Sequence, residues 1–339
     1  MKNILLAVFI PAIFASTAVT AKTGQPDKDM NKVLNELSAK GGKPIESLSA
    51  VEARMQPTPA DAVKELMKKE NKTKQPDLAE VREIEVDGAA GKIPARLYVP
   101  KAKGPLPIVV YYHGGGFVIA SNDVYDATPR SLAEKTKAIF VSVEYRKGPE
   151  FKFPAAHDDA FAAYKWVVAH AASFGGDPKK IAVAGESAGG NLALNVAIRA
   201  RDEGIQKPTH ELLVYPVAGN DMNSESYKEN AAAKPLNKPM MEWFIKNYTR
   251  TPEDVNDPRL NLVAANLKGL AAATVITAEI DPLRTEGKNL ADKLKAAGVA
   301  VEYKNYNGVS HEFFGMASVV EEANDAQKFA AKELHHSFK

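Results

Sequence analysis

The chain contains no cysteine among its 339 residues. This excludes disulfide bonds, thiolate catalysis, Cys-based zinc sites and lipid attachment at a cleavage-site cysteine. The chain also has little excess charge, because 44 Lys and Arg residues stand against 42 Asp and Glu residues, for a net charge of +2. The two signs are interspersed, so the sequence offers neither a basic stripe for nucleic acid nor an acidic tail.

The apolar run at the N-terminus is short. It follows Lys2, starts at Ile4, continues for about 12 residues and gives way to small residues up to Ala21. Twelve helical residues span roughly 18 Å, against roughly 30 Å of bilayer hydrocarbon. A positive start, a short apolar core and small residues before Lys22 are typical of a secretory signal. We therefore expect a signal peptide over residues 1–21, no stable membrane span, and export to the periplasm or the medium; an uncleaved anchor helix is the alternative.

A pentapeptide with a serine at its centre, Gly185-Glu-Ser-Ala-Gly189, is the most informative motif. It follows an apolar run at 181–184 and precedes a helical pattern from Asn191 onward. A serine at the tip of a sharp strand-to-helix turn exposes its hydroxyl, and the flanking glycines avoid clashes in the crowded turn. The motif in this context predicts a serine hydrolase with Ser187 as nucleophile.

A glycine-rich turn, His113-Gly-Gly-Gly-Phe117, follows the apolar run at 108–112. Such a turn leaves backbone N–H groups free, and acyl transfer needs donors where the tetrahedral intermediate carries its negative oxygen. We expect Gly114 and Gly115 to be donors, with Ala188 as the third. A flexible loop or a phosphate cradle is the alternative, but no Gly-Lys-Ser/Thr follows as in a P-loop.

The order of apolar and periodic segments predicts the fold class. Residues 22–80 are rich in lysine, with helical patterns near 29–39 and 60–69, and we expect an N-terminal cap segment there. From Val81 onward strands dominate, beginning with a hairpin signal at Asp87-Gly88. The expected strands cover 81–86, 93–99, 108–112, 138–143, 181–184, 211–215, 273–277 and 300–306. Helical patterns alternate with them at 128–137, 155–172, 187–202, 285–297 and 320–335. This predicts an α/β fold over residues 81–339, with a mostly parallel eight-stranded sheet, helices on both faces and a cap insertion at about 217–262.

The remaining catalytic groups are expected on loops that follow later strands. In this architecture the nucleophile is followed by an acid and then by a histidine. Asp281 follows the strand expected to end at Thr277, and His311 follows the last strand. His311 is then the base that activates the serine, and Asp281 orients the imidazole and stabilises its charged form. Glu279, two residues earlier, is the alternative acid.

At this point the chain resembles the bacterial hormone-sensitive-lipase family of α/β-hydrolase esterases. The resemblance covers about residues 105–316 and rests on the two glycine motifs and on further short matches: Tyr145-Arg146, Pro149-Glu150, Phe153-Pro-Ala-Ala156, Gly176-Asp-Pro178, Asp281-Pro-Leu283 and His311. It implies carboxylesterase activity on short acyl chains, a cap of two parts and no cofactor.

The chain departs from the family pattern at three places. Glu186 stands where the family usually has Asp, and Lys147-Gly148 replaces an apolar pair. His311 is followed by Glu312 and Phe313, where the family often has Gly before the Phe. The last change is expected to alter a wall of the acyl pocket while leaving the imidazole in place.

Other polar and apolar groups have two interpretations each. Met240, Met241, Trp243 and Phe244 line an acyl pocket or pack as cap core. His157-Asp158-Asp159 is a metal site or a helix start whose carboxylates cap N–H groups, and we favour the cap. Four polar residues resemble a fragment of a calcium loop but lack its spacing and glycine, so we expect a polar loop without metal there: Asn220, Asp221, Asn223 and Glu225.

Two classes of function remain open at the level of sequence. The first is an esterase acting on a small ester, with a lactonase or amidase as a variant that uses the same residues. The second is a ligand-binding protein of the same fold, because some members of the superfamily are hormone receptors that lost a catalytic residue. His311 favours the enzyme, since a receptor needs no imidazole there.

Overall fold

An eight-stranded sheet forms the centre of the computed structural model, which describes residues 24–72 and 74–339. The expected signal peptide lies outside these described residues. The strand order is β1-β2-β4-β3-β5-β6-β7-β8, β2 runs antiparallel to both of its neighbours, and all other pairings of neighbours are parallel. The strands are β1 Leu78–Gly88, β2 Gly91–Pro100, β3 Leu106–Tyr112, β4 Ile139–Val143, β5 Gly176–Glu186, β6 His210–Val214, β7 Ala272–Ile280 and β8 Val301–Ser310. The predicted fold class is confirmed.

The first hairpin turns two residues later than its sequence signal suggests. Strand β1 continues through Gly88, which pairs with Gly91, so Ala89 and Ala90 form the turn. Gly91 has φ +127°, a conformation that other residues rarely adopt. Asp159 also accepts a hydrogen bond from the N–H of Ala89 at 2.9 Å. A distant carboxylate and a glycine that ends the turn therefore set its position.

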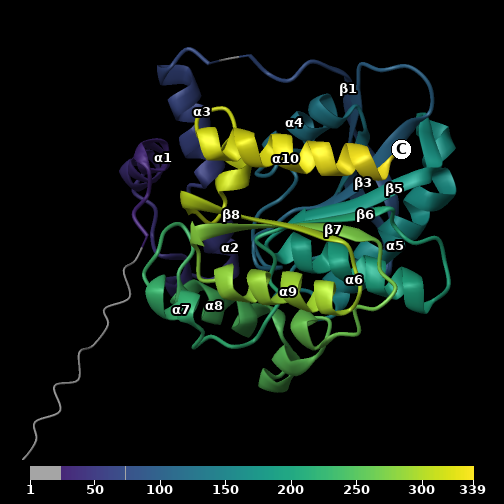
Figure 1. The fold of residues 1–339 in the computed structure, drawn as a ribbon. Helices are drawn as coiled ribbons and strands as arrows, with labels where there is room; N and C mark the ends of the chain where they lie inside the picture. Colours follow the sequence, from purple (N-terminus) through teal and green to yellow (C-terminus); the bar gives the residue numbers. More distant parts are fainter. Residues whose placement is uncertain (1–23, 73) are drawn as a thin grey trace, which may run out of the picture.

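Both faces of the sheet are buried under helices, which explains why the central strands are apolar throughout. On β3, Ile108, Val110 and Tyr112 point to one face and Val109 and Tyr111 to the other, and all five are almost completely buried. Figure 1 shows α4 and α10 over one face and α6 and α9 over the other. The helices around the sheet are α4 Ala127–Thr136, α5 Ala155–His170, α6 Ala188–Asp202, α9 Arg284–Ala296 and α10 Glu321–Ser337.

Two further helical segments gather at one end of the sheet, on the left of Figure 1. We call residues 24–72 the N-terminal segment and residues 217–262 the inserted segment. Their helices are α1 Lys28–Ala39, α2 Ala50–Arg54 and α3 Pro59–Lys69 in the first, and α7 Glu225–Glu229 and α8 Lys238–Tyr248 in the second. Helices α2 and α3 begin at capping boxes, in which Ser49 pairs with Glu52 and Thr58 with Asp61. The Trp243 side chain on α8 joins the segments by donating a hydrogen bond to the carbonyl of Leu48 at 3.0 Å.

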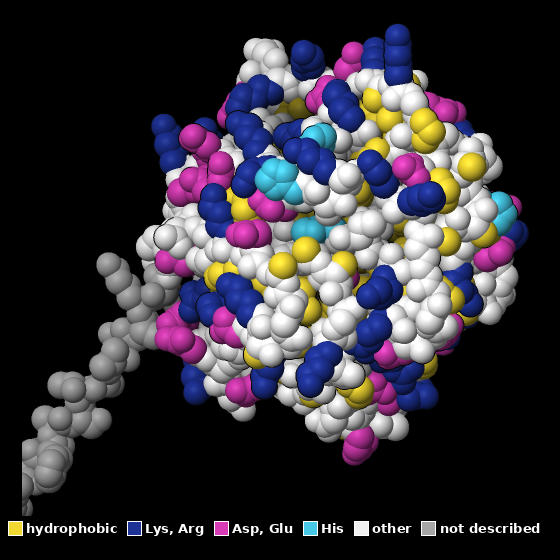
Figure 2. All heavy atoms as spheres, turned by 45° about the vertical axis from the view of Figure 1, so that its right-hand side comes forward, with side chains coloured by type: hydrophobic (Ala, Val, Ile, Leu, Met, Phe, Trp, Pro, Cys, Tyr) yellow, Lys and Arg dark blue, Asp and Glu magenta, His cyan; other side chains and the backbone are white. Residues whose placement is uncertain are grey.

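The surface mixes charges of both signs over the face shown in Figure 2. Within residues 24–72 and 74–339, no helix combines the length and the apolar character that a bilayer crossing requires.

Candidate active site

Ser187 occupies the sharp turn between β5 and α6. Its φ is +56°, a conformation that is costly for a residue with a side chain. The turn is crowded on both sides: a Cβ on Gly185 would lie 2.1 Å from the carbonyl oxygen of Gly189, and a Cβ on Gly189 would lie 1.9 Å from that of Tyr112. Only glycine fits these two positions, and the serine between them is held at the carboxyl end of the central strand.

Three of the predicted residues form one chain of hydrogen bonds. His311 Nε2 lies 3.0 Å from Ser187 Oγ, and His311 Nδ1 lies 2.7 Å from Asp281 Oδ2. Asp281 Oδ1 accepts a further hydrogen bond from the N–H of Leu283 at 2.8 Å. The alternative acid, Glu279, instead accepts a hydrogen bond from the N–H of Gly308 at 2.7 Å. The structure therefore brings Asp281, and not Glu279, to the histidine.

The surroundings of His311 favour its protonated form. Ser187, Asp281 and His311 are at most 4 % exposed. Burial lowers the pKa of His311, but the negative charge and hydrogen bond of Asp281 outweigh it, so the pKa is raised above 6.5. The ring of Tyr215 packs on the imidazole with centroids 4.5 Å apart. The imidazole is thus a stronger base than free histidine, in a fixed orientation.

The glycine-rich turn lies beside the serine. Gly115 and Gly116 have φ of +97° and +58°, and Gly115 lines the same cavity as Ser187. The Gly115 carbonyl accepts hydrogen bonds from Val118 and Ile119, which closes the turn. Among the described residues, no loop or turn hydrogen bond uses the N–H groups expected to be donors, those of Gly114, Gly115 and Ala188.

Known proteins resemble this arrangement along most of the chain. A family model described as the alpha/beta hydrolase fold matches residues 109–315. Carboxylesterase NlhH of Mycobacterium tuberculosis is 40 % identical over 252 residues, which are 73 % of this chain and 79 % of that protein. The ethyl acetate hydrolase of Pseudomonas putida is 33 % identical over 317 residues, covering 91 % and 98 %. An esterase structure from Pyrobaculum calidifontis has a TM-score of 0.83 at 37 % identity, covering 92 % of this chain and 98 % of that one.

The chain belongs to the bacterial hormone-sensitive-lipase family and is a carboxylesterase. The family predicted from the motifs is confirmed, and with it the hydrolysis of carboxylic esters.

The esterase holds a cavity of about 390 Å³ over Ser187 and His311. Both helical segments contribute to its walls, the N-terminal one through Leu34, Leu37 and Ile45 among others. Of the four side chains considered for an acyl pocket, Met240, Met241 and Phe244 line this cavity. Trp243 does not, because its position on α8 turns it toward Leu48 of the N-terminal segment.

Arg54 is a residue of the esterase that the sequence motifs did not reveal. Its guanidinium donates to the carbonyl of Val118 at 2.9 Å, to that of Gly148 at 2.7 Å and to both oxygens of Glu150. It thereby ties α2 to the loop that carries the glycine-rich turn. No local pattern marks this arginine, since its partners lie 64 to 96 residues away.

Two departures from the family pattern are neighbours of the predicted residues in sequence, Glu186 before Ser187 and Glu312 after His311. Glu186 accepts hydrogen bonds from the hydroxyls of Tyr111 and Tyr215, and burial raises its pKa to about 7 although both hydrogen bonds oppose the shift. Glu312 accepts a hydrogen bond from the Tyr125 hydroxyl at 2.5 Å. The third departure also makes contacts: Lys147 donates to the Ala120 carbonyl at 2.7 Å.

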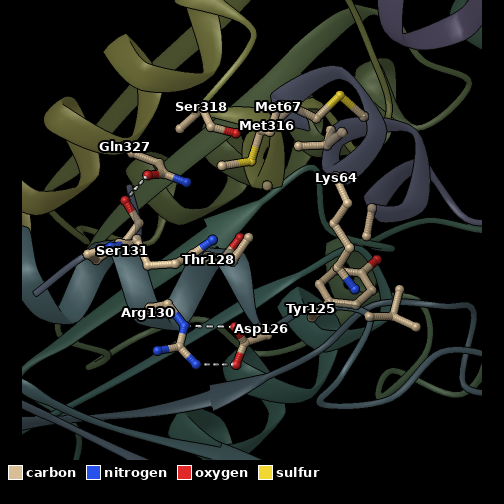
Figure 3. A pocket seen from close by; sticks show the side chains of 18 of the residues that line it. Lys64, Met67, Tyr125, Asp126, Thr128, Arg130, Ser131, Met316, Ser318 and Gln327 are labelled. Atoms are coloured by element: carbon tan, nitrogen blue, oxygen red, sulfur yellow. Dashed lines mark hydrogen bonds and ion pairs between the residues drawn. The ribbon is translucent and has the colours of Figure 1, made fainter. Parts of the chain in front are cut away.

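Tyr125 and Glu312 also line a second cavity, of about 430 Å³, which does not reach Ser187. Figure 3 shows this second cavity from close by, with the Arg130–Asp126 and Ser131–Gln327 contacts along one side. The two side chains thus form part of the wall between the cavities.

The groups considered for metal binding are occupied by protein partners. His157 contacts the Tyr248 hydroxyl and Asn191 Oδ1, each at 2.9 Å. Asp159 does not cap its own helix, because it accepts hydrogen bonds from Arg146 and from the β1–β2 turn. In the polar loop, Asp221 accepts from the N–H of Asn223. Within the described part of the chain, no three His, Asp or Glu side chains converge as metal ligands.

Proposed function

We propose that this esterase cleaves short-chain carboxylic esters through an acyl-enzyme intermediate. Ser187 is the nucleophile, His311 the general base and then acid, and Asp281 the residue that orients the imidazole and stabilises its charged form. The observation that carries the proposal is the continuous hydrogen-bond chain from Asp281 through His311 to Ser187, at 2.7 and 3.0 Å.

In the first half-reaction Ser187 Oγ attacks the ester carbonyl while His311 Nε2 takes its proton. The carbonyl oxygen becomes negative, and the N–H groups of Gly114, Gly115 and Ala188 stabilise it. The intermediate then collapses, the bond to the alcohol oxygen breaks, and His311 gives the proton to the leaving alcohol.

In the second half-reaction water attacks the acyl-serine. His311 takes a proton from the water, the same backbone donors stabilise the second intermediate, and Ser187 leaves with the proton returned by His311. The cycle ends with a carboxylic acid and regenerated enzyme, and it consumes one ester and one water.

Short acyl chains are proposed because the cavity is small and its walls are bulky. Met240, Met241 and Phe244 narrow it on the side of α8. We further propose that the N-terminal and inserted segments together form the substrate-covering cap. The sequence predicts this cap at residues 22–80 and about 217–262, but residues 78–80 already belong to strand β1.

A direct test is labelling with a small alkyl phosphonate ester that carries a p-nitrophenyl leaving group. Mass spectrometry of the digested protein should locate the phosphonyl group on Ser187, with one p-nitrophenolate released per chain. Labelling at another residue, or none while p-nitrophenyl butyrate is hydrolysed, would refute the assigned nucleophile.

A lactonase or amidase is the second candidate, since the same residues serve for those bonds. Cyclic esters and anilides offered beside p-nitrophenyl butyrate decide between them by their kcat/KM values. The receptor alternative is disfavoured by the esterase relatives and by the retained histidine.

We also propose that the esterase is exported and that its signal peptide is cleaved after Ala21. Cleavage after Ala18 is the alternative. The support is the sequence of residues 1–21, outside the described part of the structure. N-terminal sequencing of protein from the culture medium or the periplasm tests this; a protein that retains Met1 in the cytoplasm contradicts it.

A further inference from the structure

Glu312 directly follows the histidine in an unusual backbone conformation. Its φ is +72°, in the left-handed region where glycine is favoured and where the family often has glycine. A residue with a side chain pays a conformational penalty there that glycine avoids, and such strain gathers at functional sites. The carboxylate therefore needs an explanation beyond the turn that it occupies.

The carboxylate of Glu312 is held next to the reacting atoms. Its Oε1 accepts the Tyr125 hydroxyl at 2.5 Å and lies 4.0 Å from His311 Nε2, the atom that protonates the leaving alcohol. The side chain is 23 % exposed and lines the cavity over Ser187. The Tyr125 hydroxyl packs closely against Gly114, since a Cβ on that glycine would lie 2.2 Å from the hydroxyl oxygen. The Oε2 atom receives no hydrogen bond from the described residues.

Glu312 is not the only carboxylate that lines the cavity. Glu46 also lines it, but Glu46 Oε2 is a buried atom that a substrate does not reach. Lys43 and Lys234 also line the cavity, but both are exposed and neither forms an ion pair with these carboxylates. A substrate that brings a hydroxyl group can donate to Glu312 Oε2, which receives no hydrogen bond from the described residues.

We propose that Glu312 is a specificity-determining residue that accepts a hydrogen bond from a hydroxyl on the carbon next to the leaving oxygen, so that the esterase favours monoesters of 1,2-diols. This inference rests on the proposed function, because it takes His311 to be the acid that protonates the leaving alcohol.

The geometry of a 1,2-diol matches the gap beside the imidazole. Its two oxygens lie about as far apart as two hydrogen-bonded oxygens. When the leaving oxygen is within hydrogen-bond reach of His311 Nε2, the neighbouring hydroxyl can therefore reach the Glu312 carboxylate, whose Oε1 lies 4.0 Å from that nitrogen. An alkyl group of the same size leaves the carboxylate without its donor.

The test compares 2-hydroxyethyl butyrate with propyl butyrate, which have the same number of non-hydrogen atoms. For the wild-type enzyme, kcat/KM should be at least about tenfold higher for the hydroxyethyl ester, the range expected for a hydrogen bond to a charged group. In Glu312→Gly, whose backbone suits the left-handed turn, the ratio should fall to about 1. Glu312→Gln should give an intermediate ratio, since its amide oxygen accepts without charge.

Glu46→Gln is the matched control, because it removes one negative charge from the same cavity without touching Glu312. Its ratio should equal that of the wild type. Equal ratios in wild type and Glu312→Gly overturn the inference, as does an equal loss in Glu46→Gln. Hydrolysis of p-nitrophenyl butyrate by the wild type separates failure of this inference from failure of the proposed function. If the wild type hydrolyses this ester but has a hydroxyethyl-to-propyl ratio near 1, only the role of Glu312 is refuted. If it hydrolyses no ester, the proposed function is refuted as well.

Discussion

The strand-end residues around Ser187 and the helical walls above them are built in different ways. Ser187, Asp281 and His311 are almost completely buried and joined by hydrogen bonds, each on a turn that follows a strand of one sheet. The walls come from segments almost 200 residues apart, which meet through apolar contacts and bonds such as that from Trp243 to Leu48. The difference suggests that the sheet carries the chemistry and the walls select the ester.

The strongest test of this division is Ser187→Ala. Losing the nucleophile of such a triad costs on the order of 10⁶ in kcat, about 8 kcal/mol of transition-state stabilisation. We expect this loss for every ester, with an unchanged circular dichroism spectrum and melting temperature. Turnover above a few per cent of the wild-type value would place the nucleophile elsewhere.

Asp281→Asn should reduce kcat by about 10⁴ while leaving KM nearly unchanged, because the amide favours the wrong imidazole tautomer. Glu279→Gln is the matched control, since Glu279 bonds to Gly308 and not to His311. Steady-state kinetics with p-nitrophenyl butyrate measure both variants. A larger loss in the control would reassign the acid.

The pH dependence of kcat/KM tests the charge state of His311 at the end of the sheet. His311 must be neutral to act as base, and its pKa is raised above 6.5 by Asp281 against the effect of burial. The kcat/KM value for an uncharged ester should therefore fall about tenfold per pH unit below a midpoint that lies above pH 6.5. Asp281→Asn removes the raising charge, so its residual activity should have a lower midpoint. A profile flat from pH 5 to 8 would contradict the assigned base.

The smallest effect is expected from the walls. Phe244 packs against Gly116, where a Cβ would lie 2.3 Å from the ring, and it lines the cavity. Phe244→Ala should lengthen the pocket and move the preferred p-nitrophenyl ester to longer acyl chains, with about fourfold in kcat/KM per added methylene that fits. Ile245→Ala, on the same helix but outside the cavity lining, should keep the wild-type preference. Equal turnover of C4 and C16 esters by the wild type would refute the short pocket.

Much of the fold and of the candidate site was accessible from the sequence. The serine turn and the glycine-rich turn are short motifs, and their glycines mark the positions where the backbone needs a positive φ or a close approach. Asp281 and His311 followed from their position after strands, because parallel strands end at the same edge of a sheet. All eight strands were expected: the first two from their alternation around a hairpin signal, and the central ones from runs of apolar residues that reflect burial on both faces.

Contacts between distant segments were decided only by the tertiary structure. The sequence offered four apolar residues, now on α8, as pocket lining or cap core, but the packing against the N-terminal segment separated Trp243 from the three that line the cavity. Asp159 was expected to cap a helix and instead binds Arg146 and the hairpin turn, which moved that turn to Ala89 and Ala90.

The sequence alone therefore determined the tight turns of the candidate active site, and the tertiary structure determined which side chains surround them. A tight turn needs particular residues at particular positions, so its sequence reports it directly. The partner of a side chain depends on which segments meet after folding. The Tyr125 hydroxyl donates to Glu312 Oε1 at 2.5 Å, although the two residues are 187 positions apart. No sequence motif predicts this contact, because the packing of the whole fold brings the two side chains together beside His311.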